Sequence, residues 1–183
     1  MIMSKALRIS PAILNRANAG NTEAQFKLAQ MYMESGLDEH VEIAEEWALK
    51  AAGLGHVEAM YWLGEGYVAY AKDMREEDPE ESKTYFEHAH HWLKQAAAEQ
   101  HPSAILELSN FYRRGDVVEK DVEKSIQMVE QAAKLGEVQA MRDLAFIYAN
   151  GLGIDANEEK ADFWTAKAEA IEPSTATPPT DQE

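Results

Sequence analysis

The strongest constraint on this chain is an internal repeat with a period close to 36 residues. An alanine opens each unit, and these alanines are Ala24, Ala59, Ala104 and Ala140. They lie 35, 45 and 36 residues apart. A leucine follows each alanine after four residues and a tyrosine after eight, a spacing that puts all three on one ridge of an α-helix. Self-similarity at this period predicts a solenoid of helical hairpins.

Each unit also contains the parts of a second helix. A small residue follows each leucine, which lets another helix come close. After Tyr148, two glycines at Gly151 and Gly153 break the first helix, and a new helix is expected to start near Asn157. The second helices have a large anchor residue at equivalent places, and these anchors are Trp47, Trp92, Met128 and Trp164.

The combined pattern A-x-[aromatic]-x-L-[small]-x-x-Y-x-x-G-x-G, followed by K-A-x-x-W, resembles the Sel-one-like repeat, a relative of the tetratricopeptide repeat. The resemblance covers roughly residues 12–171. It is strongest in the fourth repeat, where the matching residues are Gly151, Gly153, Lys160, Ala161 and Trp164. The third repeat has Val117 at the second glycine and Met128 at the tryptophan, and the second repeat has no glycine turn.

We therefore expect an all-α fold, a right-handed α/α superhelical solenoid of about four helix–turn–helix repeats with an N-terminal cap helix. The expected single domain covers residues 1–171, with the cap helix at 10–19 and the repeats at 20–54, 55–99, 100–135 and 136–171. Residues 172–183, acidic and rich in proline and threonine, are expected to form a flexible tail. Asn21, Asp78 and Asp121 are expected to cap helices.

The second repeat contains an insertion. From Tyr67 to Trp92 there are 25 residues, against 15 or 16 between the equivalent residues of the other repeats. The extra material includes the acidic run 73–81, in which Pro79 suits the first position of a helix. We expect two longer helices joined by a protruding acidic loop. That loop is either a solvated extension or a docking loop for a basic partner.

Composition excludes several classes of function. The net charge of −16 opposes binding to phosphate backbones, so nucleic acid is not expected as a partner. A basic protein partner, or simple solubility, fits this charge better. The chain has no cysteine, which excludes disulfides and thiolate chemistry and fits a reducing compartment such as the cytoplasm. We expect neither a signal peptide nor a membrane span, because no apolar run approaches ~18 residues.

Candidate chemistry is sparse. On a predicted helix, Glu87 and His91 are four residues apart and His88 and His91 are three apart, so either pair could chelate a metal from one face. A catalytic zinc needs a third ligand and an open position, and the sequence shows no third ligand. We therefore expect no catalytic residue, no metal and no cofactor. His56 and His101 occupy equivalent positions at the start of two first helices, which favours a role in starting those helices.

The expected partner-binding surface is the concave face, which the first helices of such a solenoid line. The residues expected there are Lys27, Met31, Trp62, Glu65, Glu107, Phe111, Arg114, Asp143 and Ile147. Trp62 and Phe111 are the expected anchors, because aromatic side chains dominate binding energy at interfaces. For Phe111, packing between neighbouring helices is an equal alternative.

The resemblance implies a non-enzymatic scaffold, an adaptor or regulator that binds a protein or peptide. Some bacterial Sel-one-like proteins are immunity proteins, so a stoichiometric inhibitor of a bacterial toxin or secreted effector is the alternative. A metal-dependent enzyme that uses the histidine cluster is a remote third hypothesis.

Overall fold

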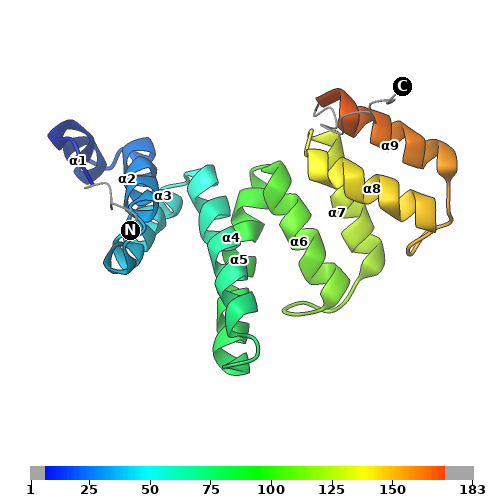
Figure 1. Ribbon diagram of the computed structural model, residues 1–183, viewed down its shortest axis with the longest axis horizontal. Coiled ribbons are helices and arrows are strands. Elements are labelled where there is room, and N and C mark those ends of the chain that lie inside the picture. The colour runs from blue at the N-terminus through cyan, green and yellow to red at the C-terminus, as the bar shows by residue number, and fades with distance from the viewer. Residues whose placement is uncertain (1–6, 172–183) are drawn as a thin grey trace, which may run out of the picture. The chain divides into compact units, whose positions relative to one another are not determined.

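The computed structural model describes residues 7–171, and all regular structure in this range is helical (Figure 1). The α-helices are α1 (Pro11–Asn18), α2 (Thr22–Glu34), α3 (Val41–Gly53), α4 (Val57–Met74), α5 (Pro79–Ala98), α6 (Pro102–Arg114), α7 (Val122–Lys134), α8 (Val138–Asn150) and α9 (Glu158–Ile171), with a 3-10 turn η1 (Asp38–His40) before α3. The predicted all-α architecture of four helix pairs preceded by an N-terminal helix is confirmed. The tail expected at 172–183 lies outside the described residues.

Two compact units make up the chain, and they meet in sequence after Leu108. The first contains α1 to α5 and the start of α6; the second contains the end of α6 and α7 to α9. Within each unit, helices that follow one another in sequence pack together. Short connections explain this arrangement, because they leave little choice but an antiparallel neighbour.

The predicted ridge forms the core. The opening alanines and the leucines of all four repeats are buried, and Leu28 and Leu144 are fully enclosed. The tyrosines eight residues after the alanines lie nearer the helix ends. Of these, Tyr148 is buried, while Tyr32, Tyr67 and Tyr112 are half-buried. Their rings therefore remain partly accessible from solvent.

Small residues beside the ridge allow two helices to come close, as the sequence predicts. Gly64 of α4 faces Leu93 of α5, and a Cβ atom at Gly64 would lie 2.6 Å from Leu93 Cγ. Real Cβ atoms do not come so near, so an alanine there would force α4 and α5 apart. Gly66, two residues further along the same helix, has open space at its Cβ position.

An asparagine or aspartate caps the start of α2, α5, α7 and α9. The side chains of Asn21, Asp78, Asp121 and Asn157 each accept a hydrogen bond from the backbone N–H three residues later, at 2.8–2.9 Å. Such a bond satisfies one of the four N–H groups that an α-helix leaves unpaired at its start. The caps expected at Asn21, Asp78 and Asp121 are therefore confirmed.

The two histidines at equivalent helix starts are also caps, as predicted. Nδ1 of His56 accepts the N–H of Ala59 at 3.1 Å, and Nδ1 of His101 accepts that of Ala104 at 3.2 Å. With Nδ1 acting as an acceptor, the neutral ring has its hydrogen on Nε2. That hydrogen points to a carboxylate of the preceding repeat: His56 Nε2 lies 3.1 Å from Glu23, and His101 Nε2 lies 3.3 Å from Glu58.

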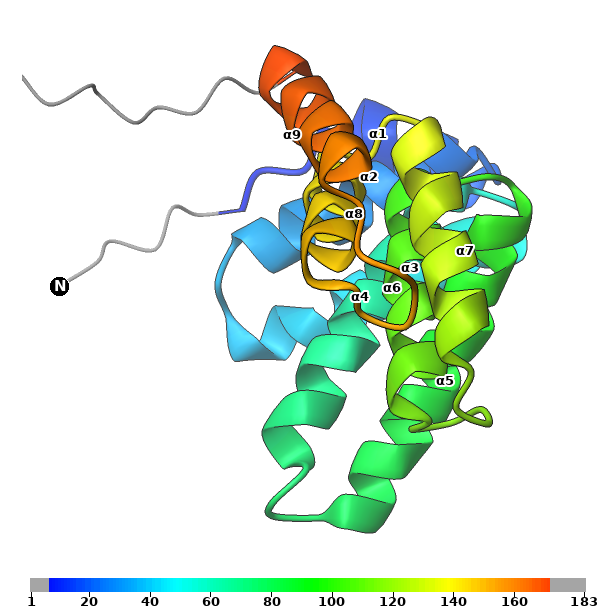
Figure 2. The same ribbon diagram turned by 90° about the vertical axis from the view of Figure 1, so that its right-hand side faces the viewer.

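The insertion in the second repeat mainly lengthens the helices. α4 has 18 residues and α5 has 20, whereas α2 and α3 have 13 each. The connection between α4 and α5 is only residues 75–78, at the tip of the hairpin that both views show extending past its neighbours in the first unit (Figure 2). The expected longer helices and acidic connection are confirmed.

Substitution of the two glycines of α4 tests the close approach. Gly64→Ala should lower the free energy of unfolding by about 1–3 kcal/mol, because the added methyl group overpacks Leu93. Gly66→Ala, the matched control, should raise it by about 0.5–1 kcal/mol, since alanine favours a helix where nothing blocks its methyl group. Urea denaturation followed by circular dichroism measures both. Equal effects of the two substitutions would show that helix propensity alone decides and that the contact is not tight.

Candidate functional site

Trp62 lies where a partner can reach it. Its side chain is half-buried on α4, and the edge of its ring packs against Phe26 of α2, with ring centroids 6.3 Å apart and planes at 76°. Phe26 is itself buried. The buried phenylalanine supports one side of the tryptophan, so the accessible part of the indole is held in a defined position.

The other predicted surface residues of the first unit differ in exposure. Lys27 and Glu65 are exposed, while Met31 and Glu107 are half-buried. These charged and flexible side chains fit the polar rim of an interface around an aromatic anchor. Whether they contact a partner stays a prediction.

In the second unit, the predicted surface residues separate into accessible and buried ones. Phe111 is only 4% exposed. Of the two interpretations left open for this residue, its burial favours packing, so Phe111 does not belong to an accessible surface. Arg114 is exposed at the end of α6, and Asp143 and Ile147 are half-buried on α8.

Asp143 and Ile147 line a groove of about 460 Å³ within the second unit. The groove also involves α6, α7 and the loop after α8; its other lining residues are Ser109, Asn110, Arg113, Val122, Ser125, Ile126, Val129, Phe146, Leu152 and Gly153. Two apolar side chains at its edge are strongly exposed, Phe146 at 62% and Leu152 at 46%. Exposed apolar side chains around a hollow are typical of protein-binding surfaces.

The sequence prediction missed Phe146 and Leu152. A signal for Phe146 was present, since it lies six residues after Ala140, and the equivalent residues of the other repeats are Gln30, Glu65 and Asn110. A phenylalanine where three repeats have polar residues distinguishes this position of the fourth repeat. The exposure of Leu152 depends on the conformation of the glycine loop, which the pattern alone does not give.

A second hollow, the tyrosine pocket, lies within the first unit between α3, α4 and α5. It measures about 530 Å³ and is lined by Glu45, Tyr67, Asp78, Glu80, Glu81, Thr84, Tyr85 and His88. The hydroxyl of Tyr67 donates a hydrogen bond to the carboxylate of Glu45. Burial raises the pKa of Tyr67 far above its usual value, and the bond to Glu45 raises it further. Burial, followed by the neighbouring Tyr70 and Glu81, also raises the pKa of Tyr85, so both phenols keep their protons at neutral pH.

The histidine cluster does not assemble a metal site among residues 7–171. His88 faces the ring of Tyr67, with centroids 5.5 Å apart, whereas Nε2 of His91 lies 2.7 Å from the amide nitrogen of Gln95. In the described part of the chain, no three histidine or carboxylate side chains come together around one point. The expectation of no bound metal stays a prediction. None of the helices from α1 to α9 is both long and apolar enough to cross a membrane.

Comparison with known proteins places these features in a family. The Sel1 repeat family matches this chain at residues 22–56, 57–101, 102–137 and 138–170. A chitin synthase regulator of Saccharomyces cerevisiae, SKT5, is 32% identical over 88% of this chain and 23% of its own length. The Sel1-repeat-containing protein YjcO of Escherichia coli is 30% identical over 86% of this chain and 65% of its own length. This chain therefore spans less than two thirds of either relative.

Solved structures agree with this assignment. The crystal structure of a Sel1 repeat protein from Oxalobacter formigenes superposes with a TM-score of 0.71 at 27% identity, covering 87% of this chain and 62% of the other. The protective antigen c5321 of uropathogenic Escherichia coli superposes with a TM-score of 0.73 at 24% identity, covering 90% and 34% respectively. The second likeness concerns the fold alone.

Two phenylalanines of the second unit test which surface is accessible. Phe111→Ala should lower the free energy of unfolding by about 3–5 kcal/mol, because it leaves a cavity in a packed site. Phe146→Ala should change it by less than about 0.5 kcal/mol, since most of that side chain already contacts solvent. Thermal and urea denaturation of the two variants measure the difference. A large loss of stability from Phe146→Ala would show that this ring is structural and remove it from the groove surface.

Proposed function

The chain belongs to the Sel1 repeat family, and we propose that it is a non-enzymatic scaffold, an adaptor or regulator that holds a protein or peptide partner through the first helices of its repeats. Sel1 repeat proteins generally mediate protein–protein interactions. The observation that carries the proposal for this chain is the half-exposed Trp62 seated on the buried Phe26. An aromatic side chain held in place before binding loses little conformational entropy when a partner covers it.

Charge supports a basic partner. The net charge of −16 attracts a positively charged protein and speeds its association at low ionic strength. We propose that the complex forms in the cytoplasm, where a chain without cysteine loses nothing to the reducing conditions. The name of the yeast relative, a regulator of chitin synthase, supports a regulatory role without identifying this chain's partner.

The same surface and charge also suit a stoichiometric inhibitor of a basic bacterial toxin or secreted effector. The two roles separate by what the partner does. An inhibitor abolishes its partner's enzymatic activity at one-to-one stoichiometry, whereas an adaptor leaves that activity in place.

Trp62→Ala tests the proposed binding site. We expect the variant to bind the captured partner about thirtyfold more weakly, which corresponds to roughly 2 kcal/mol for the loss of a central tryptophan anchor. Helicity and the melting temperature should change little, because the side chain lies at the surface and is only partly buried. Affinity capture from native lysate identifies the partner, and titration of the purified partner by calorimetry measures the affinity.

Phe163→Ala serves as the matched control. Phe163 is an exposed aromatic residue, 53% accessible, on α9, the second helix of the fourth repeat. Because the proposed partner binds the first helices, Phe163→Ala should leave the affinity unchanged. If Trp62→Ala unfolds the protein and binding falls only in proportion, Trp62 is a core residue. If Phe163→Ala weakens binding as much as Trp62→Ala, the partner does not use the first helices.

A further inference from the structure

In two repeats, a lysine of the second helix covers the tyrosine of the first helix. Lys124 Nζ lies 3.9 Å from the ring centroid of Tyr112, and Lys160 Nζ lies 4.7 Å from that of Tyr148. Lys160 Nζ is also 3.5 Å from the hydroxyl of Tyr148. The face of an aromatic ring attracts a cation electrostatically. The space over this tyrosine therefore binds an ammonium group in both repeats.

The second repeat has the same space but no lysine to fill it. Lys124 and Lys160 lie four residues before the anchors Met128 and Trp164, and the residue four before the anchor Trp92 is His88. The imidazole of His88 is exposed and tilted at 56° to the ring of Tyr67. No lysine or arginine is among the residues that line the tyrosine pocket.

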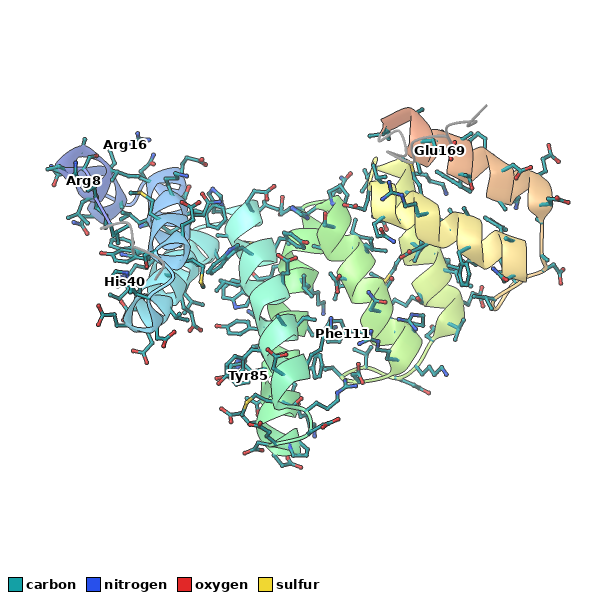
Figure 3. The ribbon with its side chains drawn as sticks, viewed as in Figure 1. Arg8, Arg16, His40, Tyr85, Phe111 and Glu169 are labelled. Atoms are coloured by element: carbon teal, nitrogen blue, oxygen red, sulfur yellow. The ribbon has the colours of Figure 1, made fainter. Side chains whose placement is uncertain are left out.

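Aromatic rings make up much of the wall of this pocket. The ring of Tyr85 lies 5.9 Å from that of Tyr67 and 6.2 Å from that of His88. Tyr70, which is 47% exposed, lies 4.5 Å from Tyr85 and supports it from the side. Tyr85 is on the flank of the α4–α5 hairpin (Figure 3). An inserted side chain would therefore meet more than one ring.

The pocket is also strongly acidic. Glu45, Asp78, Glu80 and Glu81 contribute four carboxylates to its lining. Opposing them is the N-terminus of α5, whose dipole amounts to roughly half a positive charge. Asp78 offsets part of that dipole by accepting the N–H of Glu81 at 2.9 Å. The balance is negative, which favours a cation over an anion in this pocket.

We propose that the tyrosine pocket receives the ammonium group of a lysine side chain presented by the protein partner. The ring faces of Tyr67 and Tyr85 and the carboxylates of Glu45 and Glu81 hold it in place of the lysine that the third and fourth repeats supply themselves. Lysine is favoured over arginine because lysines fill both equivalent spaces. This inference rests on the proposed function, since a binding partner must provide the side chain.

A short peptide tests the pocket without the partner. The probe is acetyl-Gly-Lys-Gly-amide, titrated into the full chain and followed by NMR of the aromatic side chains. We expect saturable shifts at Tyr67, Tyr85 and His88. The matched control is the same peptide with norleucine, which keeps the alkyl chain but removes the charge, and it should cause no such shifts. Tyr148, whose space already holds Lys160, should not respond to either peptide.

His88→Lys provides the decisive variant. The new lysine should fill the pocket as Lys160 does in its own repeat, and the peptide should bind roughly three- to tenfold more weakly. Because residue 88 is exposed, this substitution should leave the fold intact. Glu81→Gln removes a carboxylate without changing its size and should also weaken binding.

Several results would overturn the inference. One is that the His88→Lys variant binds the lysine peptide as tightly as the unchanged chain does. The others are that the norleucine peptide causes the same shifts as the lysine peptide, or that Tyr148 shifts as much as Tyr67. A third peptide, acetyl-Gly-Arg-Gly-amide, tests the choice of lysine, and binding of this peptide without binding of the lysine peptide would overturn that choice. A negative peptide result combined with a strong effect of Trp62→Ala on partner affinity would refute the pocket and leave the proposed function standing. The reverse combination would refute only the binding site around Trp62.

Discussion

The structure depends on how closely the two helices of each repeat can approach. Alanines and leucines form the ridge between them, and where the approach is closest, at Gly64 and Leu93, even a methyl group does not fit. A tight ridge has no room for large rings, so the tyrosine of each first helix stays near the helix end. Three of the four are half-buried there. Polar partners then satisfy the phenol, as Glu45 does for Tyr67 and Glu130 does for Tyr148. The packing that builds the core thus also creates the polar, ring-lined spaces at its margin.

Histidines join the repeats of the first unit. His56 and His101 each satisfy a helix start through one ring nitrogen and a carboxylate of the preceding repeat through the other. Each ring also packs on an aromatic neighbour, His56 against Phe26 and His101 against Tyr61. Asn21 caps α2 at the equivalent position, and its side-chain oxygen also accepts a hydrogen bond from Arg16 of the preceding helix at 3.2 Å. The fourth repeat has Glu137 at this position, which accepts the N–H of Gln139 at 3.3 Å.

The sequence predicted the fold well because its signals are local or periodic. The alanine–leucine–tyrosine ridge, the caps at Asn21 and Asp121, and the lengthened helices of the second repeat all follow from spacing and residue type. The site was predicted less well, because exposure away from the ridge depends on side chains from several helices. The sequence named both Phe111 and Trp62 as expected anchors for a partner, yet Phe111 is buried and Trp62 is only half-buried. The groove around Phe146 and the tyrosine pocket each involve at least three helices, and no pattern along one helix describes them.

The insertion in the second repeat changes charge as well as length. It places Glu80 and Glu81 in the first turn of α5, where they line the same pocket as Tyr67. The equivalent tyrosines of the third and fourth repeats lie under a lysine, and the residue in that lysine's position in the second repeat is His88. In the fourth repeat, residues of this chain supply both charges beside Tyr148: the carboxylate of Glu130 accepts its hydroxyl hydrogen, and the ammonium group of Lys160 lies over its ring. In the second repeat, the acids lining the pocket have no lysine or arginine among them. Like charges held close together destabilise a folded chain, and such unfavourable arrangements are typical of functional sites. A cation supplied from outside would relieve the repulsion among these carboxylates, so the difference between this repeat and the third and fourth repeats is better explained by binding than by stability.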